Sequence, residues 1–203
     1  MIRHILIFIL SGLLFSCSDS EKLQLIEPGS KILAFGDSLT YGTGTSRDNS
    51  YPAVLQSLTG IEVINAGIPG ETSGQGLRRL PGLIKRHQPD IIIICQGGND
   101  ILRKMDEDKM RDNIQQMIDL ARSNDSQVVL IGVPDFGIFL QPLPVYRLLA
   151  EQNGIPIAED ILSEIIADNR LKADQIHPNA KGYRILAEEI ADLLSRTGAI
   201  QKL

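Results

Sequence analysis

Residues 31–40 read Lys-Ile-Leu-Ala-Phe-Gly-Asp-Ser-Leu-Thr, and this stretch decides the fold. A run of apolar residues that ends in a glycine and short polar residues is typical of a buried β-strand leading into a loop. A strand that is apolar on both faces must be covered on both sides, which favours a parallel sheet between two layers of helices. The stretch therefore predicts an α/β fold whose first strand carries a polar loop to one edge of the sheet.

The alternation of short aliphatic runs with longer amphipathic runs continues along the chain. Strands are expected at residues 31–35, 61–65, 90–95, 127–132 and 155–158. Helices are expected at residues 51–58, 74–86, 108–123, 143–152, 160–167 and 179–196. Strict alternation implies right-handed crossovers between parallel strands. We therefore expect one flavodoxin-like domain over residues 31–203, a three-layer α/β/α sandwich with a mainly parallel five-stranded sheet.

The composition excludes several classes of protein. Of the 203 residues, 43% are hydrophobic and 22% are charged, which excludes wholesale disorder. The formal net charge of −5 argues against nucleic-acid binding, because phosphate contacts need clustered Lys and Arg. The sequence offers no typical metal-ligand cluster and none of the glycine-rich phosphate motifs. We expect a monomer without a cofactor, a metal ion or a nucleic-acid partner.

The first residues have the character of a secretory signal. Arg3 and His4 precede an apolar run over residues 5–15 that is too short to span a bilayer as a helix. The run ends in Leu14-Phe15-Ser16-Cys17, which resembles the bacterial lipobox, although Phe15 departs from the small or β-branched residue usual there. The alternatives are a plain secreted protein with an ordinary cleavage site and a retained membrane anchor.

The lipobox resemblance implies a location and an anchor. Residues 1–16 would be removed, Cys17 would be acylated, and residues 17–30 would form a tether to the domain. The protein would then be an extracytoplasmic lipoprotein held at a bacterial membrane, in the periplasm or at the cell surface. Cys95, which follows four isoleucines, would be the remaining thiol, and its surroundings are typical of a buried core residue rather than a nucleophile.

Polar segments follow three of the predicted strands. They are Gly36-Asp37-Ser38-Leu39-Thr40, Ala66-Gly67-Ile68-Pro69-Gly70 and Gly97-Gly98-Asn99-Asp100. In an open parallel sheet the carboxyl ends of the strands meet at one edge, where ligands bind. A fourth segment, Asp174-Gln175-Ile176-His177-Pro178, precedes the last helix and could reach the same edge.

A serine nucleophile needs a base to take its proton and a third group to orient that base. Of the three histidines, His4 leaves with the signal and His87 lies in a polar surface connection. His177 therefore remains as the base, with Asp174 three residues earlier as its orienting carboxylate. The alternative is that this Asp-x-x-His pair only starts the last helix.

Ser38 is the candidate nucleophile, and it is also a candidate helix cap, as is Asp37. The two roles are compatible, because a serine at a helix N-terminus lies among unpaired backbone N–H groups. Thr40 stands where the second glycine of a Gly-x-Ser-x-Gly motif would be, which argues against an α/β-hydrolase nucleophile elbow.

These segments, in this order, resemble the SGNH hydrolase family, also called GDSL esterases and lipases, over about residues 31–196. The likeness is greatest to its bacterial thioesterase I, lysophospholipase and arylesterase group. The blocks that carry it are Phe35-Gly36-Asp37-Ser38-Leu39, Asn65-Ala66-Gly67, Gly70-Glu71-Thr72-Ser73, Gly74-Gln75-Gly76-Leu77 and Gly97-Gly98-Asn99-Asp100. The resemblance implies a cofactor-free carboxylic ester hydrolase that forms an acyl-enzyme on Ser38 with His177 and Asp174.

The same resemblance implies an oxyanion hole. Its donors would be the backbone N–H groups of Ser38 and Gly67 and the side-chain amide of Asn99, each suited to a developing negative charge. Ordinary turn chemistry is the alternative for Gly67 and Asn99. Asp37 and Asp100 are interpreted as carboxylates that brace the loops.

The substrate is open at this stage. Lysophospholipids, aryl esters and short-chain esters all fit, and residues 134–144 form either an apolar wall for an acyl chain or packing beneath a loop. Residues 101–107 are either a mobile lid or a solvated loop. The functional alternatives are a carbohydrate O-acetylesterase or acyltransferase with the same triad, and a non-catalytic flavodoxin-like binding protein.

Overall fold

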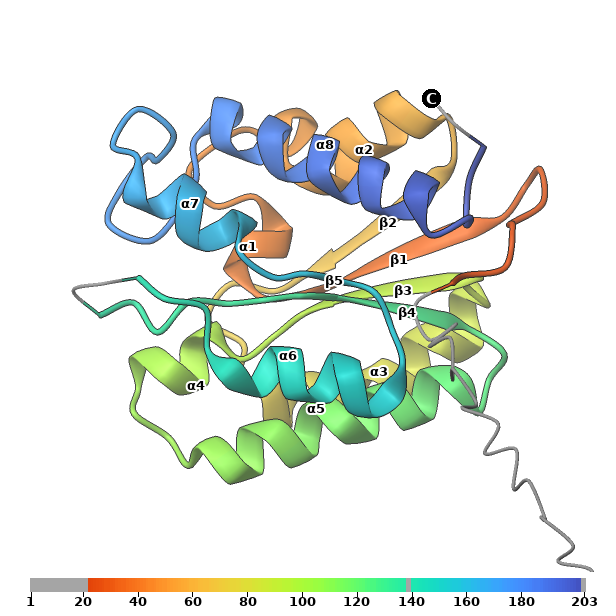
Figure 1. Ribbon diagram of the computed structural model, residues 1–203, viewed down its shortest axis with the longest axis horizontal. Coiled ribbons are helices and arrows are strands. Elements are labelled where there is room, and N and C mark those ends of the chain that lie inside the picture. Colours follow the sequence, from red (N-terminus) through yellow and green to blue (C-terminus); the bar gives the residue numbers. More distant parts are fainter. Residues whose placement is uncertain (1–21, 138–139, 202–203) are drawn as a thin grey trace, which may run out of the picture.

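The computed structural model describes residues 22–137 and 140–201, and its strands form one parallel sheet in the order β2-β1-β3-β4-β5 (Figure 1). The strands are β1 (Lys31–Gly36), β2 (Glu62–Gly67), β3 (Ile91–Cys95), β4 (Gln127–Ile131) and β5 (Ile157–Ala158). Gly36 at the end of β1 is in register with Gly67 on one side and Cys95 on the other. The chain changes direction across the sheet at β1, so its end is the topological switch point where such folds bind ligands.

Helices cover both faces of the sheet (Figure 1). One layer contains α1 (Ser38–Tyr41), α2 (Tyr51–Thr59), α7 (Ile161–Ala167) and α8 (Ala180–Arg196), with a 3-10 turn at Arg47–Asn49 before α2. The other contains α3 (Ser73–His87), α4 (Gly98–Leu102), α5 (Glu107–Arg122) and α6 (Pro144–Asn153). Within the layers α2 contacts α8 and α3 contacts α5. The predicted three-layer α/β/α sandwich with a five-stranded parallel sheet is confirmed.

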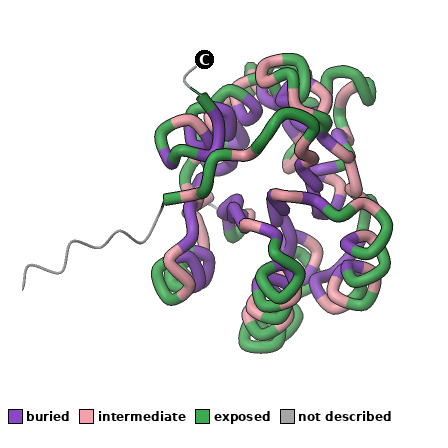
Figure 2. The backbone as a smooth tube through the Cα atoms, turned by 90° about the vertical axis from the view of Figure 1, so that its right-hand side faces the viewer, coloured by how far each residue is buried: buried purple, intermediate pink, exposed green. Residues whose placement is uncertain are grey.

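The core runs along the strands between the two helix layers (Figure 2). Every residue of β3 is buried, from Ile91 to Cys95. Burial of each isoleucine contributes roughly 1.5–3 kcal/mol relative to exposure. Cys95 is a free, buried thiol, as the sequence predicted for a core residue.

The expected helices and strands lie within two residues of their predicted ends, and the structure adds two short α-helices for which no range was predicted, α1 and α4 (Gly98–Leu102). The second of these has a plain physical reason. Its first residues come directly after the polar end of β3, and five residues are too few to show a helical period of apolar residues. Residues 101 and 102, expected as the start of a lid or solvated loop, are therefore part of a helix.

Part of the segment expected as a tether lies against the domain. The backbone N–H groups of Leu23 and Ile26 donate to the carbonyls of Thr197 and Ala199, just beyond α8, at 2.9 Å each. Residues 1–16 and Cys17 lie outside the described residues, so the signal peptide and the lipid anchor stay predictions. Within residues 22–137 and 140–201 no helix has the length and apolar character needed to cross a membrane.

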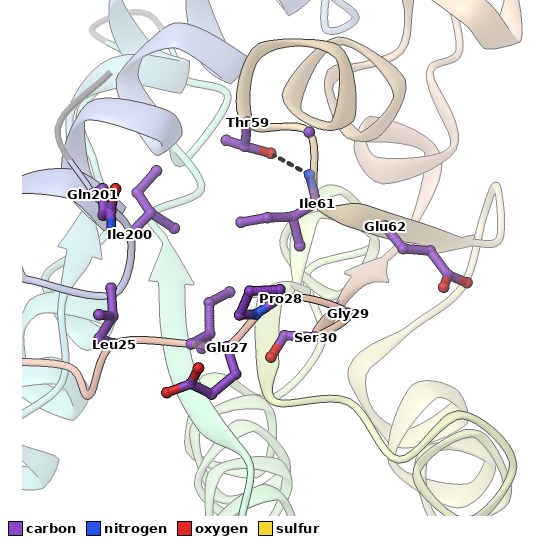
Figure 3. Close-up of a pocket in the computed structure, with 12 residues that line it drawn as sticks. Leu25, Glu27, Pro28, Gly29, Ser30, Thr59, Ile61, Glu62, Ile200 and Gln201 are labelled. Carbon is purple, nitrogen blue, oxygen red and sulfur yellow. Dashed lines mark hydrogen bonds between the residues drawn. The ribbon is translucent and has the colours of Figure 1, made fainter.

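A hollow of about 820 Å³ lies at the amino-terminal ends of β1 and β2 (Figure 3). It is lined by residues 25–30 and 59–62 together with Ile200 and Gln201. Its lining side chains include the carboxylates Glu27 and Glu62 but no histidine, cysteine, lysine or arginine. A histidine that could activate a serine must therefore be sought elsewhere, at the opposite edge where the strands end.

The step from β1 into α1 is made by Asp37, a buried carboxyl group. Asp37 is the N-cap of α1, and its side chain accepts hydrogen bonds from Leu39 N at 3.0 Å and from Asn99 Nδ2 at 3.1 Å. Burial raises the pKa of Asp37 to about 7, and these two hydrogen bonds counteract only part of the increase.

Asp37 should make the stability of the fold depend on pH. Its carboxyl group binds a proton more tightly in the folded chain, so the free energy of unfolding should fall as the pH rises from about 4 to about 7. Asp37→Asn cannot lose this proton. Its free energy of unfolding should therefore rise relative to that of the wild type, by roughly a few kcal/mol, as the pH increases over this range. Urea unfolding at a series of pH values measures the difference.

The control is Asp48→Asn, which removes a carboxylate that is exposed. Its unfolding free energy should follow the wild type with pH. If the unfolding free energy of Asp37→Asn also follows that of the wild type with pH, the buried carboxyl of Asp37 does not hold its proton as described.

Candidate active site

Four segments that are far apart in the sequence meet at the carboxyl-terminal edge of the sheet. Ser38 begins α1 directly after β1, Gly67 ends β2, and Asn99 lies in α4 after β3. The loop between α7 and α8 brings His177 to Ser38, 139 residues away in sequence. The convergence expected from the sequence is thus present in the structure.

Ser38, His177 and Asp174 form a hydrogen-bonded line. The Oγ of Ser38 lies 3.0 Å from Nε2 of His177, and Nδ1 of His177 lies 2.7 Å from Oδ2 of Asp174. The histidine side chain is 14% exposed, whereas that of Asp174 is 51% exposed. A hydroxyl, an imidazole and a carboxylate in this order can transfer a proton from the serine to the ring as the serine attacks a carbonyl carbon.

Asp174 is fixed by the turn on which it lies. Its Oδ1 accepts from the backbone N–H groups of Ile176 and His177 at 2.9 Å each. Partial burial works toward a higher pKa for Asp174, but these hydrogen bonds and the one from the His177 ring outweigh it, so the pKa is lowered. The group is therefore held as a carboxylate, which can keep the proton of the ring on Nδ1 and leave Nε2 to accept from Ser38.

Backbone contacts hold His177 against the loop after α1. The carbonyl of His177 accepts from Ala173 N at 2.8 Å, which closes the turn that contains Asp174. Gly44, at φ +97°, lies so close that a Cβ there would be 2.6 Å from the carbonyl oxygen of Pro178. Tyr183 in α8 donates its hydroxyl to the carbonyl of Thr43 at 2.8 Å. The distance between Ser38 and His177 is thus set by packed backbone on both sides.

Glycine at two strand ends lets α1 start beside the sheet. A Cβ at Gly36 would lie 2.1 Å from Thr40 Oγ1, and a Cβ at Gly67 would lie 2.1 Å from Tyr41 N. Both distances are far below contact, so only glycine fits. Gly67 therefore brings its backbone next to the helix that begins with Ser38.

The three expected oxyanion donors differ in their present partners. Among the described residues none accepts from the N–H of Ser38, whereas the N–H of Gly67 donates to Oδ1 of Asn65 at 3.0 Å. The Nδ2 of Asn99 donates to Asp37 Oδ2 at 3.1 Å and to the carbonyl of Glu71 at 3.0 Å. An oxyanion would share the last two donors with these protein acceptors.

A shallow notch of about 10 Å³ lies beside Ser38, room for about one water molecule. Its walls include Leu102, Phe136 and Ile176, together with Asn99 and His177. Phe136 is the described member of the predicted wall over residues 134–144 that reaches Ser38; residues 138–139 lie outside the described residues. The apolar side of the notch suits a small acyl group.

Other candidates from the sequence are kept apart from this site. His87 ends α3, whose first residue lies at the site, and 15 helical residues place it roughly 20 Å away. Asp100 accepts from both N and Oγ of Ser73, at 2.8 and 2.7 Å, and so braces α3 against α4 as expected. In the described part of the chain no group of three or more His, Cys, Asp or Glu side chains is arranged to hold a metal ion.

Sequence reasoning missed a polar cluster beneath the strand ends, formed by Glu71, Arg79 and Gln96. Arg79 Nε lies 2.6 Å from Glu71 Oε1, and Gln96 Nε2 donates to Glu71 Oε2 at 2.7 Å. The available signal was an arginine beside buried Gly76 and Leu80 on the inner side of α3, with an acidic residue just before the helix. An arginine in an amphipathic pattern ordinarily predicts a side chain exposed to solvent, so the pattern alone does not indicate this buried contact.

Comparison with known proteins finds a family and relatives that this chain resembles. Residues 34–185 match the GDSL-like Lipase/Acylhydrolase family. An arylesterase of Vibrio mimicus is 30% identical over 200 residues, which covers 93% of this chain and 98% of the relative. Thioesterase 1/protease 1/lysophospholipase L1 of Escherichia coli (strain K12) is 31% identical over 173 residues, which covers 80% of this chain and 82% of the relative.

Solved structures show the same architecture. The psychrotrophic esterase EstA from Pseudoalteromonas sp., in a structure inhibited by monoethylphosphonate, superposes with a TM-score of 0.72 at 26% identity, covering 82% of this chain and 97% of that one. The crystal structure of TesA gives a TM-score of 0.74 at 28% identity, covering 83% of this chain and 99% of that one. The chain therefore belongs to the GDSL-like lipase/acylhydrolase family and is a carboxylic ester hydrolase, as the motifs in its sequence implied.

Proposed function

We propose that the protein is a serine esterase that hydrolyses carboxylic esters through an acyl-enzyme on Ser38. The observation that carries this proposal is the line of hydrogen bonds from Ser38 Oγ through His177 to Asp174 at the switch point of the sheet. A flavodoxin-like binding protein would have no use for this arrangement, and the family of this chain consists of hydrolases.

The proposed reaction has two halves. In the first, Ser38 Oγ attacks the ester carbonyl as Nε2 of His177 takes its proton; the ring then gives that proton to the departing alcohol. In the second, a water molecule gives a proton to Nε2 and attacks the acyl-enzyme, and the proton returns to Ser38 as the acid leaves. Asp174 keeps the ring oriented and stabilises its charged form.

Three donors are proposed to stabilise each tetrahedral intermediate. They are the backbone N–H groups of Ser38 and Gly67 and the side-chain amide of Asn99, which come from α1, β2 and α4. Ser38 N–H also benefits from the position at the start of a helix, where N–H groups lack helical partners. Such preorganised donors commonly supply a large part of the rate enhancement.

The proposed substrates are short-chain and aryl esters. Support comes from the small notch beside Ser38 and from the similarity to an arylesterase along nearly its whole length. Lysophospholipid hydrolysis, release of acetyl groups from glycans and transfer of the acyl group to another alcohol share the same acyl-enzyme and are the alternatives. With an extracytoplasmic location, as the first residues predict, acyl-CoA would not be the natural substrate.

Loss of either proton-transfer partner should abolish turnover. Ser38→Ala and His177→Ala are expected to lower kcat for nitrophenyl acetate by about 10³-fold or more. A phosphonate ester should add its mass to the wild type and leave Ser38→Ala unlabelled. His87→Ala, at the far end of α3, is the control and should keep wild-type kinetics. An active, labelled Ser38→Ala would refute the proposed nucleophile.

Removal of the Asn99 amide should reduce the rate and leave the fold intact. Asn99→Ala is expected to lower kcat by roughly 10²–10³-fold, the usual effect of losing one oxyanion donor. KM should change little, since the amide stabilises the intermediate more than the bound ester. Steady-state kinetics checks this, and a kcat within a factor of two of the wild type would exclude Asn99 from the oxyanion hole.

The notch should select short acyl chains. Among nitrophenyl esters from acetate to palmitate, kcat/KM should be highest at two to four carbons and lower by about tenfold or more for palmitate. Phe136→Ala enlarges the notch and should shift the preference toward longer chains, whereas Leu148→Ala, an exposed residue of α6, should not. A wild type that prefers palmitate would instead favour a lipid substrate.

A further inference from the structure

We propose that Arg79, together with Glu71, is a positioning residue that orients the oxyanion donors of Gly67 and Asn99. The inference rests on the proposed esterase function. Neither side chain need touch the ester, because both act on backbone groups that lie between them and the reacting atoms. The evidence is the set of contacts that the Arg79 guanidinium makes beneath the ends of β1 and β2.

The guanidinium of Arg79 is fixed from three directions. Its Nε and Nη2 each lie 2.6 Å from one carboxylate oxygen of Glu71, which makes the pair bidentate. Its Nη2 also donates to the carbonyl of Ala66 at 2.7 Å and lies 3.2 Å from the carbonyl of Gly36. Its flat face lies over the ring of Phe35, 4.3 Å from the centroid. A group held in this way has one available orientation.

The contact with Ala66 acts directly on the proposed donor. The carbonyl of Ala66 and the N–H of Gly67 belong to one planar peptide unit, so fixing the oxygen fixes the direction of the N–H. A charged donor makes a stronger hydrogen bond to that oxygen than a neutral one. It also polarises the peptide unit, which makes the N–H of Gly67 a better donor to a negative oxygen.

The cluster also contacts Asn99 through a hydrogen bond. The Nδ2 of Asn99 donates to the backbone carbonyl of Glu71 at 3.0 Å. The side chain of the same glutamate is held by Arg79 and by Gln96 Nε2, which donates to it at 2.7 Å. The contacts of the Glu71 side chain thereby restrain the residue whose backbone carbonyl accepts from the Asn99 amide. One ion pair therefore acts on two proposed donors, one at the end of β2 and one in α4.

Stability alone does not explain why the ion pair of Glu71 and Arg79 is buried here. The side chain of Glu71 is 5% exposed and that of Arg79 is 22% exposed, so both charges lose most of their hydration. Apolar side chains of similar volume are often as good or better for stability in such a place, particularly beside an aromatic ring. The remaining hydrogen bonds of the pair go to the ends of β1 and β2. A role in orienting the oxyanion donors explains this position.

The test compares two adjacent arginines of α3. Arg79→Met retains the length of the side chain and removes the hydrogen bonds, while Arg78→Met changes an exposed neighbour. With nitrophenyl acetate, Arg79→Met should lower kcat by roughly 10- to 100-fold and change KM by less than about threefold. Arg78→Met should equal the wild type. Arg79→Lys should fall between them, because an ammonium cannot bind Glu71 with two parallel hydrogen bonds.

Two further measurements separate positioning from loss of structure. An arylboronic acid forms a tetrahedral adduct with a serine, and its affinity should fall in parallel with kcat/KM in Arg79→Met. Arg79→Met should lower kcat by a smaller factor in the Asn99→Ala background than in the wild type, because both substitutions act on one oxyanion hole. Circular dichroism shows that the variants are folded; if Arg79→Met is not, Arg79→Lys takes its place in each comparison.

The outcomes distinguish this proposal from the function on which it rests. A folded Arg79 variant with wild-type kcat, with a loss confined to KM, or with undiminished boronate affinity would overturn the positioning role while Ser38→Ala remained inactive. Wild-type activity in Ser38→Ala would instead refute the serine mechanism itself. Reduced kcat and boronate affinity in the Arg79 variant, with Arg78→Met unchanged, would establish the role.

Discussion

The site depends on how closely the backbone can approach at the ends of β1 and β2. Gly36 and Gly67 are paired in register, and a Cβ on either would lie 2.1 Å from an atom of α1. Because neither has a side chain, α1 begins where β1 ends and lies against the neighbouring strand. Gly67 thereby lies against the helix that begins with Ser38. The chemistry of the loops follows from this crowding of main chain at the switch point.

Beneath this junction the protein buries ionisable groups instead of filling the space with apolar ones. Asp37 caps α1 and meets the Asn99 amide from one side, and the carbonyl of Glu71 meets it from the other. Arg79 joins the carbonyls of Gly36 and Ala66 across the strand ends. The same hydrogen bonds that satisfy these buried groups orient the donors, so the stability of this edge and the geometry of the site are coupled.

The sequence predicted the parts of this design that have a local signature. The aliphatic runs and amphipathic periods located the sheet and its long helices. His177 could be chosen because few histidines were available, Asp174 because it lies three residues earlier, and Ser38 because its segment follows the first strand and resembles a family motif. Glu71, Arg79 and Gln96 could not be assigned a role, since their meeting depends on the tertiary fold and a charged residue on a helix is normally solvated. The hydrogen bonds from Gly67 to Asn65 and from Asn99 to Asp37 likewise could not be predicted, because they depend on the folded geometry.

The hydrogen bonds of Leu23 and Ile26 to residues just beyond α8 have a geometric consequence. The described chain enters and leaves the domain side by side, at the amino-terminal edge of the sheet, while Ser38 lies at the other edge, about the length of a six-residue strand away. Whatever is joined to either end, an anchor or a fused domain, therefore attaches on the side facing away from the nucleophile.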